Sequence, residues 1–190
     1  MTMRKKLLIG MITLFSAFTL AACGDDKEEA NHENMETDSS SEGSMDMNHS
    51  ESDEVPKGLK VAENPTFEVG SQAIIEEGHM EGMKGAEATI VGAFNTTAYT
   101  ISYTPKTGGD RITNHKWVIH EEIQDAGDQT LKQGTEVTID AEHMEGMDGA
   151  TAEIDSAEPT TVYMIDYTPT NGGEKVTNHK WVTEGELTDK

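Results

Sequence analysis

The sequence contains two copies of one unit, offset by 64 residues. The pentapeptide HMEGM at 79–83 returns at 143–147, and NHKWV at 114–118 returns at 178–182. Because the offset is the same for both motifs, they belong to a whole repeated unit. We therefore expect residues 57–124 to form a first β repeat and residues 125–190 a second, packed against each other.

Period-two patterns predict strands within each repeat. Small apolar residues alternate with other residues at 86–91 and again at 150–155, and Tyr and Ile alternate at 99–103 and 163–167. Thr-Pro followed by Gly-Gly supplies a turn after the second pattern of each repeat. A long 3.6-period apolar run with caps is missing from this part of the sequence. The prediction is an all-β fold of two tandem small SH3-like barrels, each with four or five short strands.

The N-terminus resembles a bacterial lipoprotein export signal. Basic residues at 4–6 precede an apolar stretch at 7–20, which is shorter than the roughly 20 residues of a transmembrane helix. The stretch ends in Leu-Ala-Ala-Cys, so cleavage is expected directly before Cys23. We predict a lipoprotein signal peptide at 1–22 and a lipid on Cys23 that anchors the chain to the outer, extracytoplasmic face of the cell membrane.

Residues 23–56 are predicted to comprise the lipidated Cys and a disordered acidic linker. Positions 24–56 hold twelve Asp and Glu, one Lys and almost no aliphatic residues, so they cannot bury a core. The linker also contains several soft or borderline metal donors, for which chance in a biased segment is as good an explanation as a metal-collecting role. These donors are His32, Met35, Met45, Met47 and His49.

Each HMEGM motif brings one imidazole and two thioethers within five positions, a donor set that suits Cu(I) better than Mg²⁺ or Ca²⁺. The alternative is that Met fills gaps in the core and His caps a turn. Four of the five methionines after Pro56 lie in the two motifs, and general core filling does not explain this clustering. The predicted ligands of the two soft-metal sites are His79, Met80, Met83, His143, Met144 and Met147.

Three more side chains, His115, His179 and Met164, are candidates for extra ligands or for residues that orient ligands. His115 and Trp117 lie two positions apart, as do His179 and Trp181, so each pair shares one face of a strand. The structural alternative is a histidine satisfied beside a packed Trp.

Charge and cysteine content restrict the partners. The formal net charge of −22 makes nucleic acid and anionic lipid head groups poor partners, whereas cations are attracted. A merely soluble surface would have the same charge. The single Cys is consumed by the predicted lipidation, so a Cu(I) site outside the cytosol has to be built from Met and His.

The motifs HMxGMxGAxA, TxYxIxYTPxxGG and NHKWV, each present twice behind a lipobox, resemble the YdhK family of bacterial lipoproteins. The resemblance covers essentially all of residues 57–187. It implies an extracellular Cu(I)-binding lipoprotein that acts in copper buffering or resistance, without a catalytic cofactor. A copper exporter is then a candidate partner, and storage, transfer and oxidation of the ion stay open.

Two other functions compete with copper binding. An SH3-like module for cell-wall polymer or another ligand would use the Tyr and Trp rows as its platform and the HMEGM segments as structural turns. An enzyme is not expected, because the sequence has no Ser or Cys nucleophile elbow, no HExxH and no phosphate loop.

Overall fold

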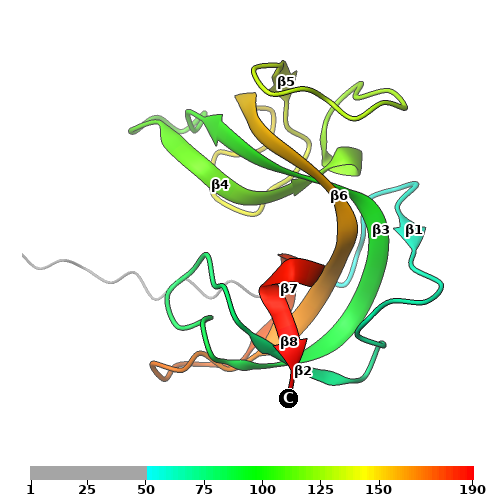
Figure 1. Ribbon diagram of the computed structural model, residues 1–190. Helices are drawn as coiled ribbons and strands as arrows, with labels where there is room; N and C mark the ends of the chain where they lie inside the picture. Colours follow the sequence, from blue (N-terminus) through cyan, green and yellow to red (C-terminus); the bar gives the residue numbers. More distant parts are fainter. Residues whose placement is uncertain (1–50) are drawn as a thin grey trace, which may run out of the picture. The chain divides into compact units, whose positions relative to one another are not determined.

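The computed structural model describes residues 51–190, which form one antiparallel sheet of eight strands (Figure 1). In chain order the elements are β1 (Lys60–Val61), β2 (Gln72–Ile75), β3 (Glu87–Tyr103), β4 (Ile112–Ile119), the 3₁₀ turn η1 (His120–Glu122), β5 (Glu136–Thr138), β6 (Thr151–Tyr167), β7 (Val176–Thr183), the 3₁₀ turn η2 (Glu184–Glu186) and β8 (Leu187–Asp189). The all-β prediction is confirmed. Within these residues no helix is long and apolar enough to span a bilayer. The predicted signal peptide, Cys23 and the linker up to residue 50 lie outside the described residues.

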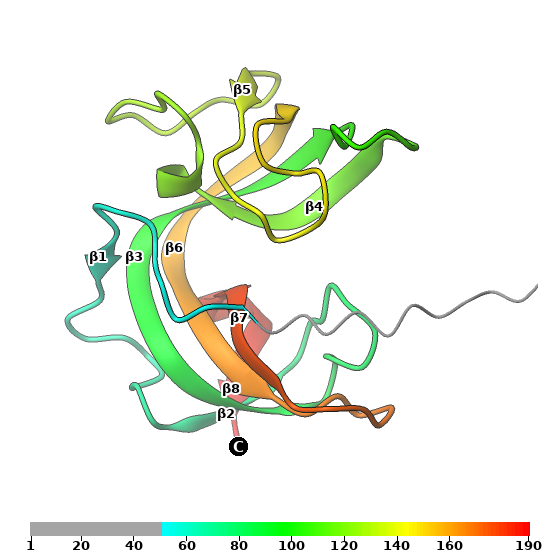
Figure 2. The ribbon, with the colours of Figure 1, turned by 180° about the vertical axis from the view of Figure 1, so that it is seen from behind.

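Two long strands form the spine of the sheet. β3 and β6 each contain 17 residues and pair antiparallel from Ala88 opposite Tyr167 to Tyr103 opposite Ala152. The sequence predicted two shorter strands in place of each. Each predicted pair of strands is one continuous strand in the structure, and at Gly92 within β3 the ring of Phe94 lies where a Cβ would be. Register shifts after positions 90 and 100 instead bend the paired strands, as Figure 2 shows from behind.

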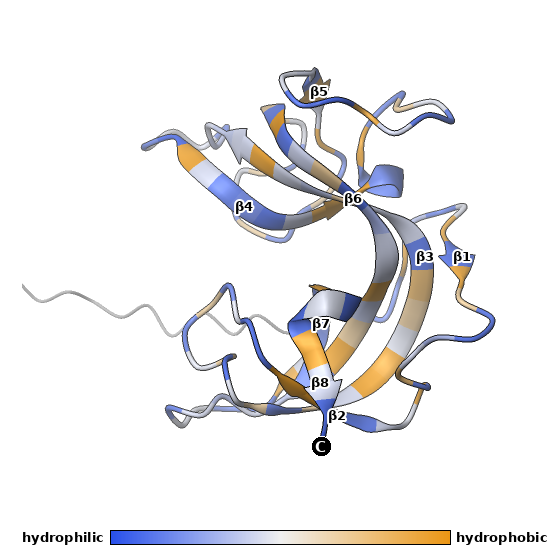
Figure 3. Cartoon of the chain, in the orientation of Figure 1, coloured by the Kyte–Doolittle hydropathy of each residue, from blue (hydrophilic) through white to orange (hydrophobic). Residues whose placement is uncertain are grey.

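The bent spine divides the sheet into two lobes, and each lobe uses strands of both repeats. The first lobe contains β2, the start of β3, the end of β6, β7 and β8, and the second contains β5, the start of β6, the end of β3 and β4. The structure thus differs from two separate SH3-like barrels, because the two halves of every repeat lie in different lobes. Figure 3 shows apolar residues along β3 and β6 in both lobes, where each lobe has its own core cluster.

A third core cluster joins the lobes at the middle of the spine. The ring of Phe94 packs edge-on against Trp181, with ring centroids 5.8 Å apart. Two indole N–H groups then bond across the lobes: Trp117 Nε1 donates to Glu186 (2.7 Å) and Trp181 Nε1 donates to Glu122 (3.0 Å). These reciprocal bonds fix the lobes relative to each other, because each lobe holds the acceptor for the indole of the other.

The end of the predicted linker lies against the first lobe. The backbone N–H of Glu51 donates to the carbonyl of Thr177 in β7 (2.9 Å), and Lys180 Nζ donates to the carbonyl of Glu54 (2.6 Å). The part of the linker that the structure describes is therefore hydrogen-bonded to the sheet, in contrast to the predicted disorder up to residue 56. Lys180 Nζ also lies 3.8 Å from the carboxylate of Glu51.

Candidate metal site

The two HMEGM motifs form tight loops that are fastened to the other repeat. Gly82 and Gly146 have φ of +78° and +76°, a region that favours glycine. The carbonyl of Gly82 accepts a bond from the Thr170 N–H, and that of Gly146 from Lys106 N–H. A Cβ on Gly82 would also collide with Asn171 of the same turn. The glycine in the motif is thus required where the loop approaches the Pro-x-x-Gly-Gly turn that follows a strand of the other repeat.

The second methionine of each motif belongs to the core. Met83 and Met147 are fully buried and lie in the core clusters of the first and second lobe, respectively. Each motif turns between its two methionines, since the N–H of Met83 bonds to the carbonyl of Met80 and the loop of Met147 does the same. The prediction that Met83 and Met147 are metal ligands is therefore replaced by the alternative, in which these side chains fill the core. Met164 likewise lies in the cluster between the lobes.

The remaining predicted ligands meet at one pocket. A cavity of about 560 Å³ between the lobes is lined by four histidines and two methionines, together with acidic residues and two lysines. The histidines and methionines are His79, Met80, His115, His143, Met144 and His179. We call His79, Met80 and His179, from the first lobe, the first half-site, and His115, His143 and Met144, from the second lobe, the second half-site. Each half-site combines the loop of one repeat with the NHKWV strand of the other.

Two imidazoles of the first half-site are already at the spacing of metal ligands. His79 Nε2 and His179 Nε2 are 3.3 Å apart. Two imidazole nitrogens, each about 2.0–2.1 Å from one ion at a tetrahedral angle, are separated by about 3.3 Å. The partly buried thioether side chain of Met80 lines the same cavity. The residues present therefore fit a soft cation held by imidazole and thioether.

A bulge in the strand directs each NHKWV histidine toward the pocket. Asn178, which precedes His179, has φ of +55°, and Asn114 before His115 has φ of +51°, a conformation that Asn tolerates. The pairing of β7 with β6 and of β4 with β3 shifts register on both sides of the histidine. Such bulges commonly re-aim a side chain.

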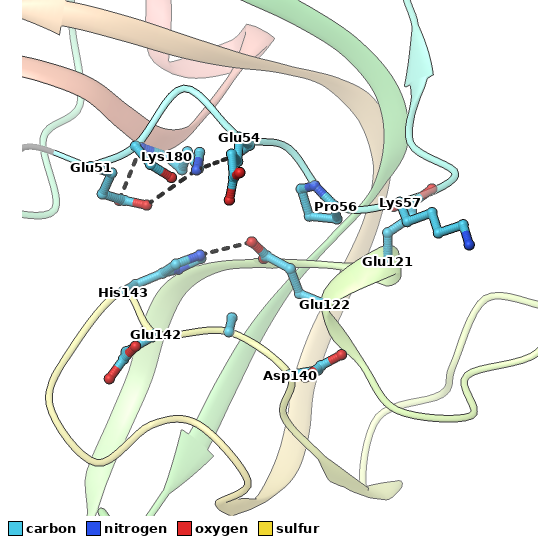
Figure 4. Close-up of a pocket in the computed structure, with 12 residues that line it drawn as sticks. Glu51, Glu54, Pro56, Lys57, Glu121, Glu122, Asp140, Glu142, His143 and Lys180 are labelled. Atoms are coloured by element: carbon cyan, nitrogen blue, oxygen red, sulfur yellow. Dashed lines mark hydrogen bonds and ion pairs between the residues drawn. The ribbon is translucent and has the colours of Figure 1, made fainter.

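The second half-site differs in its hydrogen bonding. His143 Nε2 lies 2.8 Å from Glu122 Oε1, an interaction drawn in Figure 4, and the rings of His115 and His143 are 6.4 Å apart. Burial alone would lower the pKa of His143, but the charge and hydrogen bond of Glu122 outweigh it and raise that pKa. His115 Nε2 is buried without a hydrogen bond from the described residues. Burial, reinforced by repulsion from His143 and His79, lowers the pKa of His115 to about 4, so this imidazole is neutral at pH 7.

Two buried carboxylates lie next to pocket histidines, Glu122 beside His143 and Glu186 beside His79. Glu122 and Glu186 are 3% and 4% exposed and accept the cross-lobe indole bonds. His79 Nδ1 lies 3.9 Å from Glu186 Oε1, too far for a hydrogen bond but close enough for attraction. Burial alone would raise the pKa of Glu186, but His79 and the hydrogen bonds from Thr183 and Trp117 lower it to about 2.

A second cavity, which shares His143 with the first, is acidic. Glu51, Glu54, Glu122 and Glu142 line it together with Lys180 (Figure 4). Burial raises the pKa of Glu51, although His143 and Lys180 attract its charge. Among residues 51–190 no group of three or more His, Cys, Asp or Glu is arranged to hold a metal ion.

Glu122 and Glu186 were not among the predicted site residues. A signal for them exists, because Glu122 and Glu186 are 64 residues apart, the same offset that relates Trp117 to Trp181. It was hidden by the many other acidic residues. The pocket lysines Lys116 and Lys180 show the same offset: Lys116 Nζ lies 3.2 Å from Glu186, whereas Lys180 faces the 51–54 segment.

The chain belongs to a protein family whose model matches each of its two repeats. A family described as protein of unknown function (DUF1541) matches it twice, at residues 69–120 and 133–184. The uncharacterized protein YdhK of Bacillus subtilis is 58% identical over 187 residues, which cover 97% of this chain and 90% of YdhK. The resemblance to the YdhK family is confirmed, and its copper-binding part stays a prediction.

Solved structures of Bacillus subtilis YdhK are similar in fold. A crystal structure at 2.00 Å resolution, described as that of a DUF1541 family protein, gives a TM-score of 0.73 at 64% identity and covers 76% of this chain and 98% of its own. A solution NMR structure of the YdhK C-terminal domain gives a TM-score of 0.63 at 67% identity and covers 65% of this chain and 94% of its own.

Proposed function

We propose that this protein binds Cu(I) on the outer face of the cell membrane and acts in copper buffering or resistance. The observation that carries the proposal is the convergence of four imidazoles and two thioethers on one pocket, with two imidazole nitrogens 3.3 Å apart. Thioethers favour Cu(I) over hard cations, and imidazole is a good ligand for copper. Copper is the cargo, and no catalytic step is assigned.

The surroundings of the pocket also favour a cation. Three glutamates and two lysines line it, so its formal charge is negative, and the carboxylate of Glu186 lies 3.9 Å from His79. The glutamates are Glu51, Glu142 and Glu145, and the lysines are Lys116 and Lys180. The negative charge attracts a cation into the cavity, while the neutral thioethers select a soft one.

The alternative, a cell-wall or ligand-binding module, requires exposed Tyr and Trp side chains, and these side chains are buried. Tyr99, Tyr103 and Tyr163 are fully buried, and Trp117 and Trp181 are 6% and 0% exposed. Aromatic rings that stack on a polymer have to be accessible, and these rings instead pack in the core. We therefore place the binding activity in the pocket.

A competition between Ag(I), a closed-shell substitute for Cu(I), and Zn²⁺ tests the proposal in the full chain. At pH 7 an equal concentration of Zn²⁺ should not displace Ag(I), because Zn²⁺ gains little from thioether. At pH 5 Ag(I) binding should weaken and persist, since thioethers carry no proton. Displacement by Zn²⁺, or complete loss at pH 5, would contradict a Met-containing site.

The membrane location rests on Cys23, which lies outside the described residues. Replacing Cys23 with Ala while keeping the export signal should release the protein from membranes, because the lipid is the proposed anchor. Fractionation of cells that express the C23A variant measures this. If that variant stays with the membrane, the anchor is not the lipid on Cys23.

A further inference from the structure

The backbone around the pocket is nearly two-fold symmetric, so the half-sites should be equivalent if only the fold mattered. The loop glycines have φ of +78° and +76°, and the asparagines before the strand histidines have φ of +51° and +55°. The side chains nevertheless depart from the symmetry at one point. His79 Nε2 faces His179, whereas His143 Nε2 faces Glu122.

The departure changes what an ion has to displace at each half-site. In the first half-site His79 Nε2 and His179 Nε2 hydrogen-bond to each other at 3.3 Å, so an ion held by both replaces the shared proton with little movement of either ring. In the second half-site the corresponding nitrogen of His143 is engaged at 2.8 Å with Glu122 Oε1. Glu122 is itself fixed, because Trp181 Nε1 and the N–H of Ile119 also donate to it.

From this geometry we infer that the two half-sites bind soft monovalent cations in a fixed order, the His79–Met80–His179 half-site first, and that Glu122 sets the order as a positioning residue for His143. To present Nε2 to an ion as His79 does, His143 has to give up its bond to Glu122. A hydrogen bond to a charged group corresponds to roughly a ten- to hundredfold factor in an equilibrium constant. The inference rests on the proposed function, and it replaces two near-equivalent sites by a tight one and a weak one.

The test is a titration of the full chain with Ag(I) at pH 7, followed through the histidine ring ¹⁵N resonances. The resonances identify each site directly, so donors elsewhere in the chain do not confuse the assignment. His79 and His179 should change first, and His115 and His143 should change at a free Ag(I) concentration at least tenfold higher. Simultaneous change of all four, or earlier change of His143, overturns the inference.

Two matched variants isolate the role of Glu122. Both E122Q and E186Q remove one buried negative charge near the pocket, but only E122Q alters the acceptor of His143. E122Q should lower the free Ag(I) concentration at which His115 and His143 change, so that the two steps lie within a few-fold of each other. E186Q removes the charge beside His79, so it should raise the concentration of the first step and leave that of the second unchanged. A second step that shifts equally in the two variants would show that Glu122 has a general structural role only, which overturns the inference.

The outcomes also separate this inference from the proposed function. If Ag(I) perturbs all four histidines at one concentration, the pocket binds metal and only the order is wrong. If Ag(I) binds the chain without perturbing any of them, both the order and the proposed site are wrong.

Discussion

His79 and His179 are 100 residues apart in the sequence, and their Nε2 atoms are 3.3 Å apart in the fold. The contact exists because the loop of the first repeat and the last long strand of the second repeat belong to the same lobe. Neither repeat contains a complete half-site. This chain therefore needs both copies of its repeat to form the pocket.

The first prediction concerns folding of single repeats. Residues 57–124 or 125–190 alone should not give a folded monomer, because each contains half of either lobe and would expose the apolar face that the other repeat covers. Circular dichroism and sedimentation of each fragment measure this, and mixing the two fragments should restore β structure. A folded monomeric single repeat would contradict the exchange of strands between lobes.

The cross-lobe indole bonds should contribute measurably to stability. Trp117→Phe keeps an aromatic ring but leaves the buried carboxylate of Glu186 without its 2.7 Å donor, which should lower the free energy of unfolding by about 1–3 kcal/mol. Urea denaturation provides the measurement. The matched control is Val61→Ala on β1, where the side chain is 69% exposed and a change within about 0.5 kcal/mol is expected. Equal effects of the two substitutions would contradict a structural role for the bond.

Acid should destabilise the fold through Glu186. The pKa of this carboxyl is about 2 in the folded protein and 4.5 ordinarily, so the unfolded state takes up its proton first as the pH falls. Glu186 therefore contributes stability above pH 4.5, and this contribution, on the order of 3 kcal/mol, is lost as the pH falls toward 2.

The difference between wild type and E186Q isolates this contribution from the other acidic groups. Urea unfolding at pH 6, 4 and 3 should show a steeper loss of stability in wild type than in E186Q, because Gln cannot titrate. Parallel pH profiles of the two proteins would mean that the pKa of Glu186 is not depressed.

Much of the fold follows from the sequence pattern, but the pairing of strands does not. The alternation at 86–91 and 99–103 correctly predicted strands with one face buried in a core. The 64-residue offset correctly identified the equivalent positions of the two repeats. Alternation does not specify the partner of a strand. Two similar repeats offer two equally patterned partners, and the long antiparallel pairing of β3 with β6 selects the one from the other repeat.

The sequence correctly predicted that His and Met line the candidate site, but it did not identify which of the methionines reach the pocket. Met80 and Met83 are indistinguishable by type and spacing, and the turn between them sends one to the pocket and the other to the core. The spacing of the two methionines in the sequence does not specify which side chain points to the pocket. The position of His115 and His179 at the pocket was left open for the same reason, because it depends on the bulge after each Asn.

The most direct test of the account compares two pairs of methionine substitutions by Cu(I) titration against a chromogenic chelator. Met80→Leu with Met144→Leu removes the pocket thioethers, and Met83→Leu with Met147→Leu removes the core thioethers at similar volume. We predict that the pocket pair weakens Cu(I) binding at least tenfold, whereas the core pair leaves affinity and stoichiometry unchanged and costs less than about 1.5 kcal/mol of stability per substitution. Cu(I) binding that survives the pocket pair and is lost with the core pair would contradict the account.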